Sequence, residues 1–225
     1  MTNKKLIIFC AYRDWAIEIF NNVRSGTKGI DFKIFTSPGE FDAEAAKLNP
    51  DLVFFVGWSW IIPENVVSNL KCICLHPSPL PKYRGGSPIQ HQIINGEEKS
   101  AVTLFLMDQF VDKGPIIWQE EFPLDGELYD IFCRIVEQGS KGIMETIGKY
   151  LKTGKIEGTS QDMTRATYYK RRTPEESEIK ISDFQEYTAK QLYDKIRALQ
   201  SPYPNAFIVC KDGRKLIITK ARIEE

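Results

Sequence analysis

The sequence predicts an α/β fold: a mostly parallel, Rossmann-like sheet with flanking helices and a small C-terminal α+β appendage. Short apolar runs alternate with amphipathic stretches through the first two thirds of the chain. One of these runs is unbroken and ends at a glycine, which is typical of a strand covered on both faces. The last part of the chain has a capped-helix pattern followed by a hairpin pattern. Alternating strands and helices favour a largely parallel sheet with its functional site at the carboxyl ends of the strands.

The first strands and helices are predicted from apolar periodicity. Leu6–Phe9 is a predicted buried strand, and Asp14 is a plausible cap for the helix after it. The apolar positions of that helix are Ala16, Ile19, Phe20 and Val23. Phe32–Phe35 is a second predicted strand, and the Ser37-Pro38 pair after it indicates a turn or a helix start. Leu52–Val56 is the unbroken run that ends at glycine.

Three more strands and a long helix complete the predicted sheet domain. The strands are Ile73–Leu75, Val102–Leu106 and Ile116–Trp118. The helix lies between Glu127 and Leu151, where apolar residues recur at helical spacing. They are Leu128, Ile131, Phe132, Ile135, Ile143 and Ile147. We therefore assign residues 1–155 to a catalytic domain.

The remaining residues predict a small appendage at 165–225. The stretch Thr153–Thr167 is linker-like in composition. Thr188 and Gln191 form a capping box, and Leu192, Ile196 and Leu199 make the apolar stripe of the helix that follows. Ala206–Val209 and Leu216–Ile218 alternate as a hairpin that turns near Asp212-Gly213.

Composition narrows the functional class. The 225 residues carry 30 basic and 30 acidic side chains, a formal net charge of zero, whereas general nucleic-acid binders show a basic excess. No stretch approaches the roughly 18 apolar residues of a membrane span, and the N-terminus lacks a signal-peptide pattern. The five cysteines include no Cys-x-x-Cys pair and are read as reduced. We expect a cytoplasmic protein that binds no metal, membrane or nucleic acid.

Two polar loops contain the candidate chemistry. His76–Gly86 follows a predicted strand and is rich in proline and glycine, so it cannot be regular helix or strand. Asp108–Pro115 lies between two predicted strands. Histidine is suited to proton transfer near neutral pH, and a carboxylate can orient it. Spacing alone does not join His76 to Asp112, and on that evidence the better interpretation is two solvated surface loops.

A set of sequence motifs, which includes parts of both loops, resembles the folate-dependent formyltransferases. The motifs are His76–Gly85, Asn95–Glu97, Val102-Thr103, Asp112–Pro115, Tyr168–Glu175 and Ser201–Phe207. That family includes methionyl-tRNA formyltransferase, glycinamide ribonucleotide transformylase and sugar-nucleotide N-formyltransferases. The resemblance implies transfer of a formyl group from 10-formyltetrahydrofolate to a primary amine. It also implies that His76 carries the proton and that Asp112 orients His76.

One position departs from the family pattern. The resemblance implies a catalytic Asn two residues before the histidine, and Cys74 stands there. A thiol is a poor hydrogen-bond donor and cannot replace a carboxamide at a developing oxyanion. Losing such a donor can cost roughly 2.7–4 kcal/mol. Two alternatives therefore stay open: a catalytically silent folate- or nucleotide-binding homologue, and a hydrolase that releases formate from 10-formyltetrahydrofolate.

The resemblance also implies where the two substrates bind. The stretch Gly57–Pro63 would line the folate pocket, with Trp60, Ile62, Leu106 and Asp108 as the predicted donor site. Trp58 is better interpreted as a core residue, whereas for Trp60 the core and the pocket are equal interpretations. For the acceptor, an arginine near a helix start favours an anion. The predicted acceptor site comprises Tyr12, Arg13, Ser78, Lys82, Arg84, Lys170 and Arg171.

The predicted acceptor is a nucleotide-linked amino sugar. Balanced charge and a short tail count against tRNA, because methionyl-tRNA formyltransferases carry a full second domain. Glycinamide ribonucleotide is disfavoured because its enzyme lacks the tail. Arg13 has a second interpretation as a solvated surface residue, and basic triplets such as Lys170–Arg172 are usually solvated. A homodimer is within the range of expected assemblies.

Overall fold

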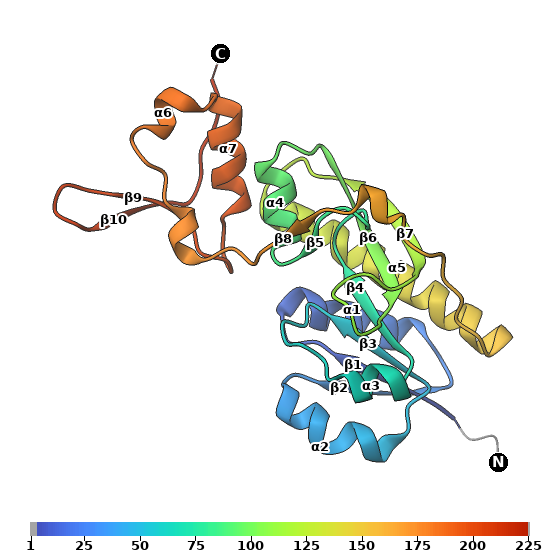
Figure 1. Cartoon of the computed structure of the whole chain (residues 1–225). Helices are drawn as coiled ribbons and strands as arrows, with labels where there is room; N and C mark the ends of the chain where they lie inside the picture. The colour runs from blue at the N-terminus through green and yellow to red at the C-terminus, as the bar shows by residue number, and fades with distance from the viewer. Residues whose placement is uncertain (1–3, 225) are drawn as a thin grey trace.

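The computed structural model describes residues 4–224, apart from the side chains of residues 42–46. It contains a six-stranded sheet in the order β2-β1-β3-β4-β6-β7. The strands are β1 Lys5–Cys10, β2 Ile30–Phe35, β3 Leu52–Val56, β4 Cys72–His76, β6 Lys99–Leu106 and β7 Ile116–Pro123. The first four strands pair in parallel, whereas β6 runs antiparallel to β4 and β7. The predicted α/β fold with a mostly parallel sheet is confirmed, with an appendage that projects from it (Figure 1).

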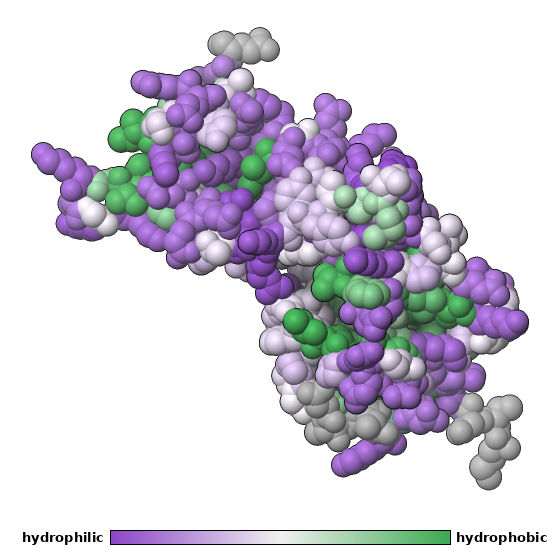
Figure 2. Space-filling view, viewed as in Figure 1, coloured by the Kyte–Doolittle hydropathy of each residue, from purple (hydrophilic) through white to green (hydrophobic). Residues whose placement is uncertain are grey.

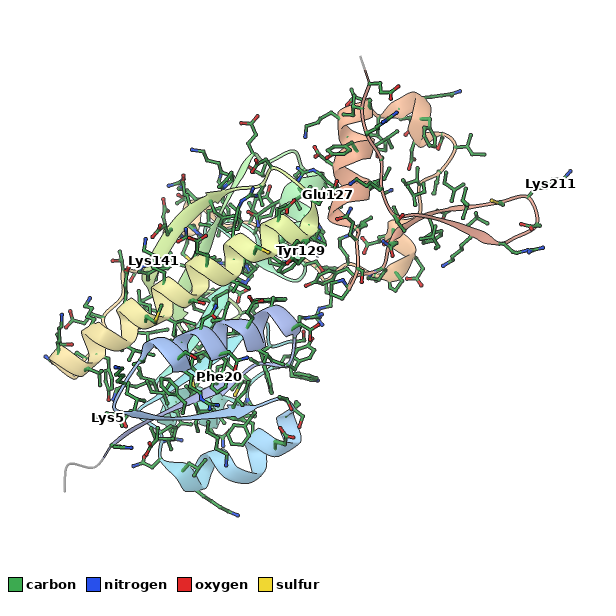
Figure 3. The ribbon with its side chains drawn as sticks, turned by 180° about the vertical axis from the view of Figure 1, so that it is seen from behind. Lys5, Phe20, Glu127, Tyr129, Lys141 and Lys211 are labelled. Carbon is green, nitrogen blue, oxygen red and sulfur yellow. The ribbon has the colours of Figure 1, made fainter. Side chains whose placement is uncertain are left out.

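Helices cover both faces of this sheet. α1 Asp14–Gly26 and α5 Leu128–Thr153 pack on one face, and Figure 3 shows them side by side there. α2 Pro38–Leu48 and α3 Glu64–Asn69 contribute apolar side chains to a second cluster on the other face. Every residue of β3 is buried, as expected of a central strand covered on both sides.

Local sequence signals set the helix ends. Ser37 caps α2, since its hydroxyl accepts a hydrogen bond from the Glu40 amide at 3.5 Å, and Pro38 takes the first helical position. α5 starts at a capping box made by Glu127 and Asp130 and ends at a left-handed glycine. Figure 3 labels Glu127 where this helix meets the appendage.

The stretch after α5 packs on the sheet domain instead of running free as a linker. Thr159 bridges to Ile116, and β8 Tyr168–Tyr169 pairs in parallel with β5 Arg84–Gly85. The short 3-10 helix η1 Met163–Arg165 lies between them in the chain. α4 Pro88–Ile94 follows β5. The polar loop after β4 is therefore fixed by a segment far from it in sequence.

The appendage has its own small core and docks on the sheet domain. Its elements are η2 Pro174–Ser177, α6 Asp183–Glu186, α7 Ala189–Ala198 and the antiparallel hairpin β9 Ala206–Val209 with β10 Lys215–Ile218. α7 packs against α4, and the Arg197 guanidinium donates to the carbonyls of Leu124 and Gly126 at 2.6 and 3.0 Å. Phe132 of α5 stacks on Tyr203 with ring centres 5.8 Å apart.

The surface is mainly hydrophilic in the view of Figure 2, with apolar groups gathered on each lobe. On the appendage, exposed apolar side chains include Ile181, Phe184, Leu216 and Ile217. Across residues 4–224, the structure has no helix of the length and apolar character that a bilayer crossing requires.

Candidate active site

His76 ends β4 and lies at the wall of a cleft, with 6% of the residue exposed. Its Nε2 lies 2.8 Å from the carbonyl oxygen of Tyr83. A carbonyl can only accept a hydrogen bond, so Nε2 carries a proton and the neutral ring keeps its lone pair on Nδ1. Nδ1 is therefore the nitrogen that can take up and release a proton.

Asp112 faces this nitrogen from the loop between β6 and β7. Its Oδ2 lies 3.7 Å from His76 Nδ1, which is within ion-pair range but too long for a hydrogen bond. The same oxygen accepts a hydrogen bond from the Gly85 amide at 2.7 Å. The ring orientation thus comes from Tyr83, and Asp112 places a carboxylate beside Nδ1.

A buried carboxamide holds the loop that carries Asp112. Gln161 Nε2 donates to the backbone carbonyls of Asp112 and Gly114 at 3.0 and 2.8 Å. Its Oε1 accepts from Nε and Nη2 of Arg84 at 3.2 and 2.6 Å. All four hydrogen bonds available to the amide are made, so Gln161 connects the two polar loops of the site.

Arg84 and Ser78, both predicted to bind the acceptor, lie inside the protein instead. Arg84 is fully buried, and beyond Gln161 its Nη1 donates to the Tyr168 hydroxyl at 2.6 Å. The Ser78 hydroxyl is also buried and donates to the Lys82 carbonyl at 2.8 Å. Both side chains shape the loop after β4, and neither reaches the cleft.

Replacing Arg84 with methionine should lower the free energy of unfolding by about 2–4 kcal/mol, because Gln161 Oε1 would lose its donors inside the protein. Urea unfolding followed by circular dichroism measures the change. The matched variant Arg165→Met removes an exposed arginine of η1 and should stay within about 0.5 kcal/mol of the parent. Equal stability of the two variants would contradict the structural role of Arg84.

The cleft beside His76 has a volume of about 690 Å³. It is open to solvent and is bounded by the carboxyl end of the sheet, both polar loops and the appendage. Of the predicted site residues, the following line it: Arg13, Trp60, Ile62, Cys74, His76, Asp108, Asp112 and Arg171. The cleft lining does not include Tyr12, Leu106, Ser78, Lys82, Arg84 or Lys170.

Aromatic rings form one wall of the cleft. The ring centres of Trp58 and Trp60 lie 4.8 Å apart, and those of Tyr12 and Trp60 lie 4.7 Å apart. The Tyr12 hydroxyl is 2.6 Å from the hydroxyl of Ser59. Trp60 is 44% exposed, so it is a surface that a flat ligand can cover and not a core residue. Tyr12 supports this wall from behind.

Arg13 lies between two tyrosines at the appendage side of the cleft. Its guanidinium carbon is 5.0 Å from the ring centre of Tyr12 and 5.3 Å from that of Tyr203. Burial raises the pKa of Tyr203, which keeps its hydroxyl protonated. Sequence reasoning missed Tyr203 as a site residue, although it belongs to the Ser201–Phe207 motif.

Cys74 lines the cleft beside the histidine–carboxylate pair but has no activated thiol. Burial, and to a lesser extent the Asp112 charge, holds the pKa of Cys74 well above its usual range. The thiol therefore stays protonated, and its best acceptor is the Leu75 carbonyl at 3.6 Å. A nucleophilic role for Cys74 has no support in this geometry. Within residues 4–224, no cluster of three or more His, Cys, Asp or Glu side chains is arranged to hold a metal ion.

The fold and the site together define a class of α/β protein with a His–Asp pair beside a cleft at the end of a parallel sheet. Residues 27–147 match the formyl transferase family, and residues 172–225 match the formyl transferase C-terminal domain. The chain therefore belongs to the formyltransferase family.

Named relatives support this assignment. The chain is 40% identical over 166 residues to methionyl-tRNA formyltransferase of Thermotoga maritima, covering 72% of this chain and 51% of that protein. It thus spans about half the length of the curated relatives it matches. A solved methionyl-tRNA formyltransferase from Clostridium thermocellum has a TM-score of 0.77 and 30% identity, covering 95% of this chain and 97% of that one. A 4-N formyltransferase from Francisella tularensis has a TM-score of 0.78 at 21% identity, covering 98% of each chain, which shows the shared fold.

Proposed function

We propose that the protein transfers a formyl group from 10-formyltetrahydrofolate to the primary amine of a nucleotide-linked amino sugar. The observation that carries this proposal is the His76 Nδ1 atom, which faces Asp112 at 3.7 Å on the wall of a cleft large enough for two substrates. Membership of the formyltransferase family supplies the reaction class.

His76 moves one proton in the proposed reaction. The amine nitrogen forms a bond to the formyl carbon, and the bond from that carbon to the folate nitrogen breaks. His76 Nδ1 accepts the proton that the amine loses and returns it to the departing folate nitrogen, so the ring ends unchanged. Asp112 stabilises the imidazolium between these steps.

The lining of the cleft includes groups that suit two different substrates. Trp60, Ile62 and Asp108 supply an aromatic surface and a carboxylate, which suit the pterin of the donor. Arg13 and Arg171 supply cations, which suit the phosphates of the acceptor. Leu106 packs against the hydrophobic core and does not line the cleft, so among the four predicted donor-site residues it has the least support for a contact with the donor.

The second candidate acceptor is methionyl-tRNA, favoured by the 40% identity to a methionyl-tRNA formyltransferase. We prefer the amino sugar because the chain has no net positive charge with which to hold a long polyanion. The deciding experiment incubates the pure protein with 10-formyltetrahydrofolate and either a panel of amino-sugar nucleotides or charged methionyl-tRNA. Mass spectrometry then identifies the formylated product.

Each outcome of this assay selects one hypothesis. Amine-dependent release of tetrahydrofolate with a formylated sugar supports the proposal, and formylated methionyl-tRNA supports the second candidate. Release of formate without any amine indicates a hydrolase. No turnover with any of these substrates, combined with tight folate binding, indicates a silent homologue.

Replacing Cys74 with asparagine should raise kcat, by up to about 100-fold, because a carboxamide can donate to the developing oxyanion and a thiol cannot. Single-turnover kinetics of formyl transfer measures the change. Cys74→Ala is the control: its rate should match that of the parent, since the protonated thiol takes no part in the chemistry. A large loss in Cys74→Ala would show that the sulfur is used directly.

A further inference from the structure

The segment 159–169, which connects the region after α5 to the appendage, contacts both polar loops of the candidate active site. At its start, the amide and the carbonyl of Thr159 form hydrogen bonds with the carbonyl and the amide of Ile116 at 2.8 and 2.9 Å. At its end, β8 pairs with β5 in the loop after β4. Between these anchors, Gln161 and Thr167 contact the backbone around Asp112 and Tyr83. Neither side chain lines the cleft, so neither is placed to touch a substrate.

Gln161 restricts the position of the backbone at Asp112. Its side chain is buried, and its Nε2 donates to the carbonyls of Asp112 and Gly114 at 3.0 and 2.8 Å. Asp112 has a φ of 54°, a left-handed conformation that is uncommon outside glycine and that surrounding contacts must maintain. Because one buried amide binds this short loop at two points, it also sets the 3.7 Å separation between the carboxylate and His76 Nδ1.

Thr167 holds the peptide to which His76 bonds. The carbonyl oxygen of Tyr83 lies 2.8 Å from His76 Nε2, and the N–H of the same peptide unit, on Arg84, donates to the Thr167 carbonyl at 2.9 Å. The amide of Tyr83, which has a φ of 59°, donates to the Thr167 hydroxyl at 2.8 Å. The C=O and N–H of a trans peptide point in opposite directions. This peptide unit is therefore fixed between His76 on one side and Thr167 on the other.

The direction of the Tyr83 carbonyl decides which nitrogen of His76 carries the proton. A carbonyl only accepts hydrogen bonds, so Nε2 donates and Nδ1 keeps its lone pair beside Asp112. If the peptide turned over, its N–H would face Nε2. Nε2 would then have to accept, the proton would move to Nδ1, and the nitrogen beside Asp112 could no longer take up a proton.

We propose that Gln161 and Thr167 are positioning residues for formyl transfer: Gln161 places the Asp112 carboxylate, and Thr167 fixes the tautomer of His76. The inference rests on the proposed function, which assigns the proton transfer to His76. It adds that the segment 159–169, whose composition is that of a linker, forms part of the support of the reacting groups. Since neither residue reaches the cleft, their replacement should change kcat and leave the KM for both substrates unchanged.

The first test compares Gln161→Glu with Gln161→Met. Both variants remove the donor that binds the carbonyls of Asp112 and Gly114, but only glutamate keeps an acceptor for the buried Arg84. We expect kcat to fall about 10- to 100-fold in both, because a small misplacement of a reacting group costs that much. Gln161→Glu should nevertheless have the higher melting temperature of the two.

Gln185→Glu changes an exposed glutamine of α6 in the same way and should leave kcat and both KM values unchanged. If kcat instead followed the melting temperature, with Gln161→Glu close to the parent, Gln161 would be a structural residue only. An increase in KM without a loss of kcat would also contradict the positioning role.

The second test reads the His76 tautomer without any turnover. The full-length protein is labelled with ¹⁵N-histidine, and its ring nitrogens are observed by NMR at about pH 8.5, above the usual pKa of histidine. His91→Asn assigns the signals, since the chain has two histidines. We expect the Nε2-protonated form of His76 in the parent. Gln161→Glu should keep this tautomer and move the Nδ1 signal, because the carboxylate beside it is displaced.

Thr167→Val removes the hydroxyl that accepts from the Tyr83 amide. The Nδ1-protonated form of His76 should then become detectable, and kcat should fall about 2- to 10-fold, the usual net contribution of one hydrogen bond. Thr167→Ser keeps the hydroxyl and should restore both the tautomer and the rate. Thr219→Val changes an exposed threonine after β10 and is the matched control.

The outcomes separate this inference from the proposed function. A parent spectrum with the proton on Nδ1, or an unchanged spectrum in both Thr167→Val and Gln161→Glu, would overturn the positioning roles. A changed tautomer with an unchanged rate would leave Thr167 as the residue that fixes the ring and would remove His76 from the proton transfer. If the parent formylates no amine, the spectra still decide the positioning roles, and the failure belongs to the proposed function.

Discussion

Replacing His76 with alanine is expected to lower kcat for formyl transfer about 10²- to 10⁴-fold, the usual contribution of a general acid–base group. The variant loses the Nδ1 atom that faces Asp112 and the bond from Nε2 to the Tyr83 carbonyl. The KM values for both substrates should change little, because the ring lies on the wall of the cleft and acts mainly on the moving proton. Stopped-flow measurement of tetrahydrofolate release gives both parameters.

His91 is the matched control, since the chain has two histidines. Its Nε2 pairs with the Lys170 carbonyl at 2.9 Å, and burial lowers its pKa, so it stays neutral near pH 7. His91→Asn should keep kcat within a few-fold of the parent. Comparable losses in the two variants would mean that imidazole chemistry at His76 is not what limits the rate.

Asp112→Asn is the second change with a large expected effect, a fall in kcat of about 10²- to 10³-fold. Asp112 has a φ of 54°, a left-handed conformation that asparagine adopts as readily as aspartate. The side-chain oxygen can still accept from the Gly85 amide. The variant therefore removes the negative charge beside His76 while the loop keeps its shape, and thermal unfolding should change little.

Asp212→Asn in the hairpin turn is the control for removing an exposed carboxylate, and it should leave kcat unchanged. A fully active Asp112→Asn variant would remove Asp112 from the mechanism.

Regular elements of the fold were predictable because each has a local cause. The buried run Leu52–Val56 and the Ser37 cap were correctly identified, and the predicted strands at 102–106 and 116–118 lie within β6 and β7. The short α3 was missed, because a helix of six residues shows too little periodicity. The packed path of residues 155–169 was also missed, since its polar composition is that of a linker.

The site depends on contacts between segments far apart in the chain, and spacing does not encode them. His76 and Asp112 meet because the Gly85 amide binds the Asp112 carboxylate and because Gln161 connects Arg84 to the second loop. A fully buried arginine without a carboxylate partner runs against the usual rule for charges, so Arg84 was read as a ligand-binding residue. The family resemblance paired His76 with Asp112, but it did not reveal this scaffold.

Residues of the sheet domain and of the appendage both line the cleft, and this has a thermodynamic consequence. Arg172 and Tyr203 come from the last third of the chain, whereas Arg13 and His76 come from the sheet domain. A molecule that touches both sets binds only while the two parts stay docked. By mass action, such a ligand at 100 times its Kd adds about 2.7 kcal/mol to the docked state. Binding of a ligand in the cleft therefore stabilises the docking of the appendage on the sheet domain. The resistance of the connection between the two parts to proteases should rise with substrate concentration.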